Sequence, residues 1–196
     1  MGARDPLTFD EAAHVYRFMG DVVPGVTSIL RPLTSFDGIP PAVLQAKAEL
    51  GRQVHLACQL LDEDDLDWAS LPPEVGGYLD AWMSFRRDTG CSVLQVEQRV
   101  FDPMLMYAGT LDRVLAFKGA KWLIDLKTSF ATPMAAGPQT AAYLRALGDT
   151  SVTHRAALRL RPDGTYRLDP LTGADDWAVF MACLSLHRFK EAHRDH

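Results

Sequence analysis

Two short segments decide the fold: GTLDRV at residues 109–114 and LIDLKT at residues 123–128. They lie within two strand-like runs, 106–117 and 121–128, which are separated by the pair Gly119-Ala120. A pair that contains glycine between two apolar runs is a turn signal. We therefore expect an antiparallel hairpin with these two residues at the centre of its turn.

Three charged side chains converge in this hairpin. Asp125 and Lys127 share a face because side chains alternate along a strand, and Asp112 falls opposite Lys127, about 7–8 Å diagonally from Asp125. Two close carboxylates repel, and a divalent cation with oxygen ligands removes that repulsion, with the Leu126 carbonyl as a further ligand. The adjacent lysine would orient or deprotonate water and offset charge on phosphorus. The alternative is an exposed ion pair worth under about 1 kcal/mol.

Other polar residues on neighbouring segments extend this pattern. His55 lies at the edge of the apolar face of a predicted long helix, and Gly51, one turn earlier, leaves room for a ligand. Gln139 and Tyr143 are spaced i, i+4 and project from one face of a later helix. Taken alone, each of these is more often a packed or surface residue. Glu97, on an alternating run, either borders the site or faces solvent.

In this order the motifs resemble the RecB-type branch of the PD-(D/E)XK nuclease superfamily, in its phage-like, stand-alone form. That branch has a histidine in a GxxxH-like helix, a GxxD strand, a (D/E)xK strand and a QxxxY helix. Here they are Gly51–His55, Gly109–Asp112, Asp125–Lys127 and Gln139–Tyr143. This chain has aspartate at position 125, where the family more commonly has glutamate.

The resemblance implies an α/β fold with a restriction-endonuclease-like αβββαβ core, in which helices flank a central mixed sheet. It also implies Mg²⁺ or Mn²⁺ as cofactor. The implied metal ligands are His55, Asp112, Asp125 and the Leu126 carbonyl. The implied catalytic residues are Asp112, Asp125, Lys127, Gln139 and Tyr143, with Glu97 as an accessory group and Arg52 and Arg113 as DNA contacts.

The implied function is a metal-dependent DNA exonuclease that hydrolyses phosphodiester bonds in phage-type recombination or repair. Two alternatives stay open: an endonuclease of the same fold, and a non-catalytic DNA-binding protein that retains the fold. The resemblance also leaves open a single-strand-annealing or recombinase partner, the strand polarity, the preference for single or double strands, and the oligomeric state.

Composition bounds these expectations. The 196 residues, 47% of them hydrophobic, fit one domain over residues 1–196. A net charge of −5 argues against DNA binding through bulk charge, so DNA would need a local basic groove or a cation that masks carboxylates. Three scattered cysteines exclude a four-cysteine metal site and, with no signal-like N-terminus and no long apolar run, predict a cytoplasmic protein away from membranes.

The remaining elements follow from periodicity and from proline and glycine positions. The acidic run 62–67 is interpreted as a solvated helix end or loop. We expect a hairpin over 14–23, helices over 26–30, 40–61 and 72–88, a strand over 92–101, a helix over 138–147, a hairpin over 153–171 and a closing helix over 177–193.

Overall fold

The computed structural model describes residues 6–11, 13–34 and 38–194, so parts of the N-terminal segment and of the predicted 1–196 domain lie outside the described residues. The strands are β1 (Leu7–Asp10), β2 (Val15–Phe18), β3 (Asp21–Val23), β4 (Ser92–Asp102), β5 (Tyr107–Phe117), β6 (Ala120–Lys127), β7 (Val152–Leu160) and β8 (Tyr166–Pro170). The α-helices are α1 (Val26–Ile29), α2 (Pro41–Asp62), α3 (Pro73–Thr89), α4 (Ala136–Leu147) and α5 (Asp176–Ala192). Two short 3₁₀ helices cover Arg31–Leu33 and Trp68–Ser70.

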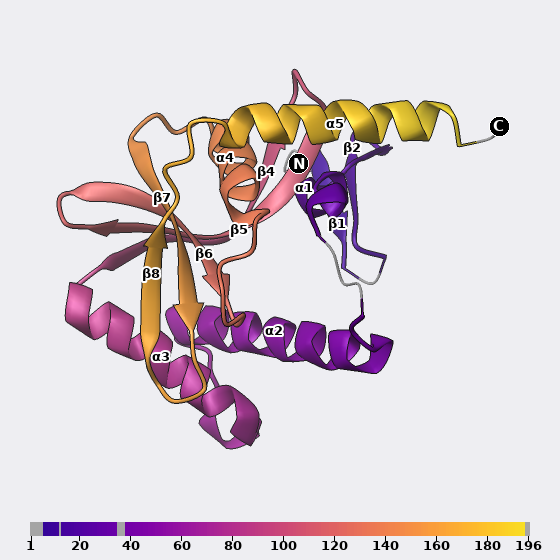
Figure 1. Ribbon diagram of the computed structural model, residues 1–196. Coiled ribbons are helices and arrows are strands. Elements are labelled where there is room, and N and C mark those ends of the chain that lie inside the picture. Colours follow the sequence, from indigo (N-terminus) through magenta and orange to yellow (C-terminus); the bar gives the residue numbers. More distant parts are fainter. Residues whose placement is uncertain (1–5, 12, 35–37, 195–196) are drawn as a thin grey trace, which may run out of the picture.

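The central sheet has five strands in the order β4-β5-β6-β7-β8. Only the β6–β7 pair is parallel, and the other three neighbouring pairs are antiparallel. Parallel neighbours require a crossover, and α4 supplies it between β6 and β7. The predicted fold class, a mixed sheet flanked by helices, is confirmed (Figure 1).

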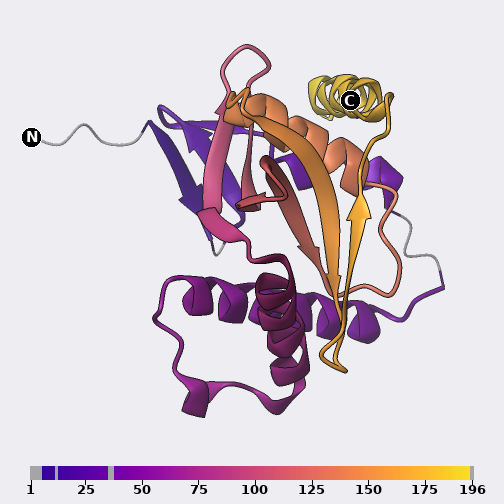
Figure 2. The same cartoon turned by 90° about the vertical axis from the view of Figure 1, so that its left-hand side faces the viewer.

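Helices cover both faces of this sheet. On one face, α2 and α3 pack through Val54, Trp82 and Phe85 against apolar residues of β5, β6 and β7. On the other face, α1, α4 and α5 pack against Tyr107 and Leu123. Figure 2 shows the two helical layers from the side, with α2 and α3 below the sheet and α4 and α5 above it. Within the described ranges, none of the helices is long and apolar enough to cross a membrane.

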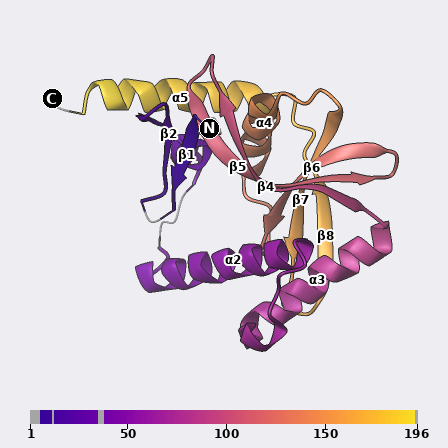
Figure 3. The same ribbon diagram turned by 180° about the vertical axis from the view of Figure 1, so that it is seen from behind.

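A second, three-stranded sheet of β1, β2 and β3 lies beside the N-terminal end of β5 (Figure 3). Tyr16 and Val23 are buried there against Ala108, and Gly25 forms a parallel bridge with the same residue. Pairing of β2 and β3 agrees with the hairpin expected over 14–23. The sequence analysis did not anticipate β1, which pairs with β2 along its whole length.

The register of the β5–β6 hairpin differs from the expected one by two residues. Its central turn residues are Lys118 and Gly119, and Val114 pairs with Leu123. Both turn residues have positive φ, 51° and 74°, which is the backbone of the type I′ turn that best matches strand twist. The expected turn at Gly119-Ala120 was therefore wrong. A shift of two residues preserves the face of each side chain, so the charged residues still converge.

Candidate active site

The site forms where β5 and β6 separate. Their ladder ends at the pair Arg113–Ile124, and Figure 1 shows β5 continuing toward α5 while β6 runs toward α2. Beyond that point the N–H of Leu126 has no strand carbonyl from β5. Instead it donates to Oδ2 of Asp112, at 2.6 Å. The Asp112 carboxylate therefore takes the place of a ladder acceptor at the fork of the sheet.

Three side chains from three elements meet at this fork. His55 of α2, Glu97 of β4 and Asp112 of β5 each offer a ligand atom, and these atoms all lie within 4.8 Å of one another. Nδ1 of His55 is 3.7 Å from Oδ1 of Asp112. One imidazole and two carboxylates form a donor set that suits a divalent cation such as Mg²⁺ or Mn²⁺. Among the described residues, this is the group that could hold a metal.

The imidazole of His55 is oriented for ligation. Its Nε2 lies 3.1 Å from the carbonyl oxygen of Leu126. A carbonyl oxygen only accepts hydrogen bonds, so Nε2 carries the hydrogen, and in the neutral ring Nδ1 keeps its lone pair on the side of Asp112. A histidine that binds a metal through one ring nitrogen usually donates the N–H of the other ring nitrogen to a carbonyl or carboxylate.

Glu97 is held in an unusual backbone conformation beside these groups. Its φ is 45°, in the left-handed region that a non-glycine residue rarely adopts. Burial, and then the nearby Asp112 carboxylate, raise the pKa of Glu97 to about 7. A carboxylate that is desolvated next to another carboxylate is stabilised by a cation. Of the two alternatives that the sequence left open, the structure favours the first, because Glu97 lies beside His55 and Asp112 in the candidate site.

A second set of polar residues continues from β6 to α4. Nζ of Lys127 lies 2.6 Å from Oδ2 of Asp125 and donates to Oε1 of Gln139, at 3.4 Å. The amide of Gln139 then donates to the hydroxyl oxygen of Tyr143, at 3.1 Å. The structure therefore brings the predicted QxxxY pair to the predicted lysine. Asp125 faces this lysine and is not part of the three-residue cluster at the fork.

Burial and neighbouring charges set the protonation states of Asp125, Lys127 and Tyr143. Burial raises the pKa of Asp125 to about 6, against the opposing effect of Lys127. Burial disfavours the ammonium of Lys127, but the Asp125 and Asp112 carboxylates outweigh it and raise its pKa. Burial likewise raises the pKa of Tyr143 well above its ordinary value. Lys127 is therefore a cation here, suited to offsetting negative charge, and Tyr143 keeps its proton.

The glycine of the GxxD motif makes room for Tyr143. A Cβ at Gly109 would lie 2.4 Å from Cε1 of Tyr143 and 3.3 Å from Cγ2 of Val26. One residue further on, Thr110 hydrogen-bonds to the hydroxyl of Tyr16 at 2.9 Å, which ties the N-terminal sheet to the site. Gly51 is different, because a Cβ there would meet only Oγ1 of Thr128 at an ordinary 3.7 Å.

A buried ion-pair network lies between the fork and the helices α2 and α3. Arg113 is fully buried, and its guanidinium donates to Asp62 at 2.7 Å and to Glu97 at 2.9 Å. Asp62 also accepts from Trp82 and from Arg86 of α3. Successive side chains of a regular strand point to opposite faces. Asp112 and Arg113 depart from this rule, because Asp112 contacts His55 and Arg113 contacts Asp62, and both partners belong to α2.

Two expectations from the sequence are corrected by this network. Arg113 was expected to contact DNA, but its side chain is 0% exposed and cannot reach a ligand in solvent. The acidic run 62–67 is exposed at Glu63, Asp64, Asp65 and Asp67, as interpreted, but the Asp62 side chain is 0% exposed. Its position seven residues after His55 places both on one face of α2, which is the signal that could have indicated it. Arg52 is exposed and pairs with Glu49.

The site opens into a cleft of about 500 Å³, here called the central cleft. Its walls come from the N-terminal sheet, α2, β4, β5 and α4. The lining residues used below are Phe9, His14, Tyr16, His55, Glu97, Asp112, Gln139 and Tyr143.

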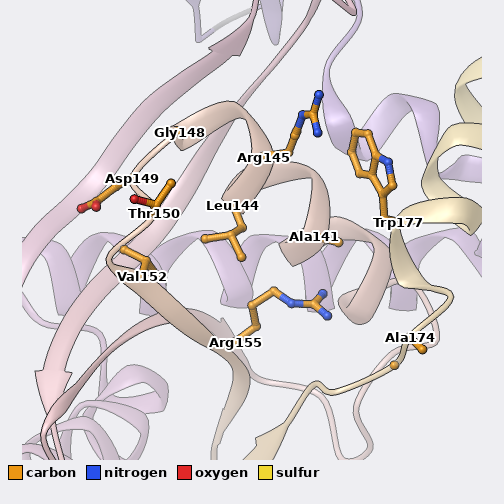
Figure 4. A pocket seen from close by; sticks show the side chains of 11 residues that line it. Ala141, Leu144, Arg145, Gly148, Asp149, Thr150, Val152, Arg155, Ala174 and Trp177 are labelled. Carbon is orange, nitrogen blue, oxygen red and sulfur yellow. The ribbon is translucent and has the colours of Figure 1, made fainter.

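A second cavity, of about 560 Å³, lies between α4, β7 and the start of α5 (Figure 4). Its arginines are already engaged: Arg155 pairs with Asp176, and Arg145 lies over the ring of Trp177. The candidate metal-ligating cluster lies outside this cavity, so the central cleft is the candidate active site.

No family model matches the chain, and no curated protein matches it. Among solved structures, it is similar to an alkaline exonuclease, LHK-Exo, from Laribacter hongkongensis, at 12% identity and a TM-score of 0.38, with 87% of this chain and 91% of that chain covered. The same exonuclease in complex with dAMP gives 14% identity and a TM-score of 0.36 over 88% and 93% of the two chains.

Proposed function

We propose that this protein is a divalent-metal-dependent DNA exonuclease of the RecB-type, formed by a single domain and acting in recombination or repair. The observation that carries the proposal is the fork between β5 and β6. There, His55, Glu97 and Asp112 present ligand atoms within 4.8 Å of one another, next to the Asp125–Lys127 pair.

His55, Glu97 and Asp112 would hold Mg²⁺ or Mn²⁺, and Asp125 and the Leu126 carbonyl stay predicted ligands. Such an ion supplies a lowered pKa for bound water and neutralises charge on a phosphoryl oxygen. The imidazole ligand favours a transition metal, so Mn²⁺ should support at least as much activity as Mg²⁺.

The other residues have separate tasks in phosphodiester hydrolysis. A water oxygen adds to phosphorus and the water releases a proton, while one P–O ester bond breaks and the leaving oxygen takes up a proton, so that the protons balance. The ammonium of Lys127 offsets the negative charge that grows on the phosphoryl oxygens. Gln139 holds Lys127 through its carbonyl and Tyr143 through its amide. Because the Tyr143 oxygen accepts from Gln139, its own hydrogen is free to donate to a DNA phosphate.

The test is a time course on end-labelled linear duplex and single-stranded DNA with Mn²⁺, run beside Lys127→Ala and beside a chelator. We expect mononucleotide or short products from the wild type, and no turnover but retained DNA binding from Lys127→Ala. Cleavage of a closed circle would identify an endonuclease instead. DNA binding without cleavage or Mn²⁺ uptake would identify a non-catalytic DNA-binding protein, and activity retained by Lys127→Ala would refute the assignment.

A further inference from the structure

A third hollow, distinct from the cavity between α4, β7 and α5, adjoins the central cleft. It has a volume of about 810 Å³ and lies between the N-terminal sheet, α1 and the C-terminal half of α5. Figure 1 shows α5 running above α1 and β2, and Figure 3 shows the same arrangement from behind. His14 and Tyr16 line both this hollow and the central cleft, so the two lie side by side. This hollow is here called the basic groove.

Uncompensated positive charge gathers in the basic groove. Arg31 lies on one wall and Lys190 of α5 on another, and both are exposed. Over residues 6–11, 13–34 and 38–194, neither side chain has an ion-pair partner. Arg194 and Glu191 also line the groove, but they pair with each other at 3.1 Å and cancel. In a chain of net charge −5, two unpaired cations facing one groove are a local feature.

The rest of the lining suits a nucleic-acid strand. Val22, Val23, Ile29 and Leu186 give the groove an apolar lining. At the junction with the central cleft, Phe9, His14 and Tyr16 form an aromatic cluster. The rings of Phe9 and Tyr16 are stacked with their centroids 4.4 Å apart. A positively charged groove that leads to aromatic rings is the usual platform for single-stranded DNA, because phosphates contact the cations and bases stack on the rings.

We propose that the basic groove binds the backbone of a single DNA strand and leads that strand into the central cleft. The proposal rests on the nuclease function proposed above and adds the path of the substrate to it. Arg31 and Lys190 contact phosphates, and the exposed ring of His14 stacks on a base at the entrance to the cleft.

The test compares two variants that remove the same charge. The groove variant carries Arg31→Gln and Lys190→Gln. The control carries Lys121→Gln and Arg167→Gln, which neutralise two partly exposed cations on β6 and β8. Binding of a fluorescein-labelled oligothymidylate is followed by anisotropy over a range of salt concentrations. All proteins carry Lys127→Ala so that the oligonucleotide stays intact.

We expect the groove variant to bind on the order of tenfold more weakly, with a salt dependence shallower by about 1.4 in log–log slope, because two of the phosphate contacts are lost. In proteins that keep Lys127 and can cleave DNA, the Arg31→Gln and Lys190→Gln changes should raise KM with a much smaller effect on kcat. The control should match the wild type, and Arg31→Lys with Lys190→Arg should restore the slope.

The outcomes separate the two proposals. If the wild type cleaves DNA and the groove variant binds and cleaves like the control, the groove proposal is wrong and the nuclease proposal stands. If the wild type does not cleave DNA, the nuclease proposal fails at its own test. If poly-glutamate binds and the groove changes weaken that binding but leave DNA binding unaltered, the groove serves an acidic protein, and the DNA path is refuted.

Discussion

Replacing Gly109 with alanine should damage both stability and the site, and the structure gives the size of the effect. The new Cβ would lie 2.4 Å from Cε1 and 3.1 Å from Cδ1 of Tyr143. Carbon atoms in contact prefer a separation of about 3.5–4.0 Å, so roughly 1 Å must be recovered by moving the ring. Tyr143 is buried, and its hydroxyl is held by Gln139, so the ring has little room to retreat.

Overpacking of this kind costs about 1–3 kcal/mol of unfolding free energy. For a chain of this length, that corresponds to a fall in Tm of roughly 2–12 °C. Movement of Tyr143 should also disturb Gln139 and, through it, Lys127, so the DNA hydrolysis rate should fall. Thermal and urea unfolding measure the first effect, and the cleavage time course measures the second.

Gly51→Ala is the matched control for stability. The added methyl group would meet only Thr128 at 3.7 Å, in the interior of α2. Alanine is a better helix former than glycine by about 0.8–1.0 kcal/mol, so this variant should be as stable as the wild type or more stable. If Gly109→Ala kept the wild-type Tm and cleavage rate, the close approach of β5 to Tyr143 would not constrain the site as described.

Two further changes test the groups around the fork. Arg113→Met keeps much of the side-chain volume but leaves Asp62 and Glu97 without their shared cation, so urea unfolding should show a loss of about 3–5 kcal/mol; a loss below about 1 kcal/mol would contradict a buried ion pair. Glu97→Gln tests the raised pKa of Glu97 in the presence of a chelator. Between the ordinary glutamate pKa and about 7, native Glu97 holds a proton that the unfolded chain has released, so its contribution to wild-type stability falls as pH rises. The variant should therefore gain stability relative to the wild type across that window and level off above it, whereas a difference independent of pH would show that Glu97 titrates normally.

Local patterns were sufficient to predict most of the elements. Proline at the start of α2 and α3 and glycine after α3 and α4 mark helix ends through backbone preferences that need no tertiary partner. Alternation within β6 placed Asp125 and Lys127 on one face, and the i, i+4 spacing placed Gln139 and Tyr143 on another shared face. These relationships depend only on the geometry of a single strand or helix.

The exact partners depended on contacts between distant segments. The ion pair of Asp62 with Arg113 joins residues 51 positions apart. Helix spacing can place Asp62 on the His55 face of α2, but no local pattern indicates that Arg113 is its buried partner. Likewise, the left-handed backbone of Glu97 and the end of the β5–β6 ladder arise where three elements meet.

The amino-acid sequence thus indicated by itself the candidate site residues and the face of each element on which they lie, since period and capping are properties of a short stretch of chain. Only the tertiary structure decided that Glu97 joins His55 and Asp112, that Arg113 is buried beneath the fork, and that Arg31 and Lys190 line a groove beside the cleft. Those choices depend on which buried charges find partners once the helices close over the sheet, because an unpaired charge in the interior is too unfavourable to persist.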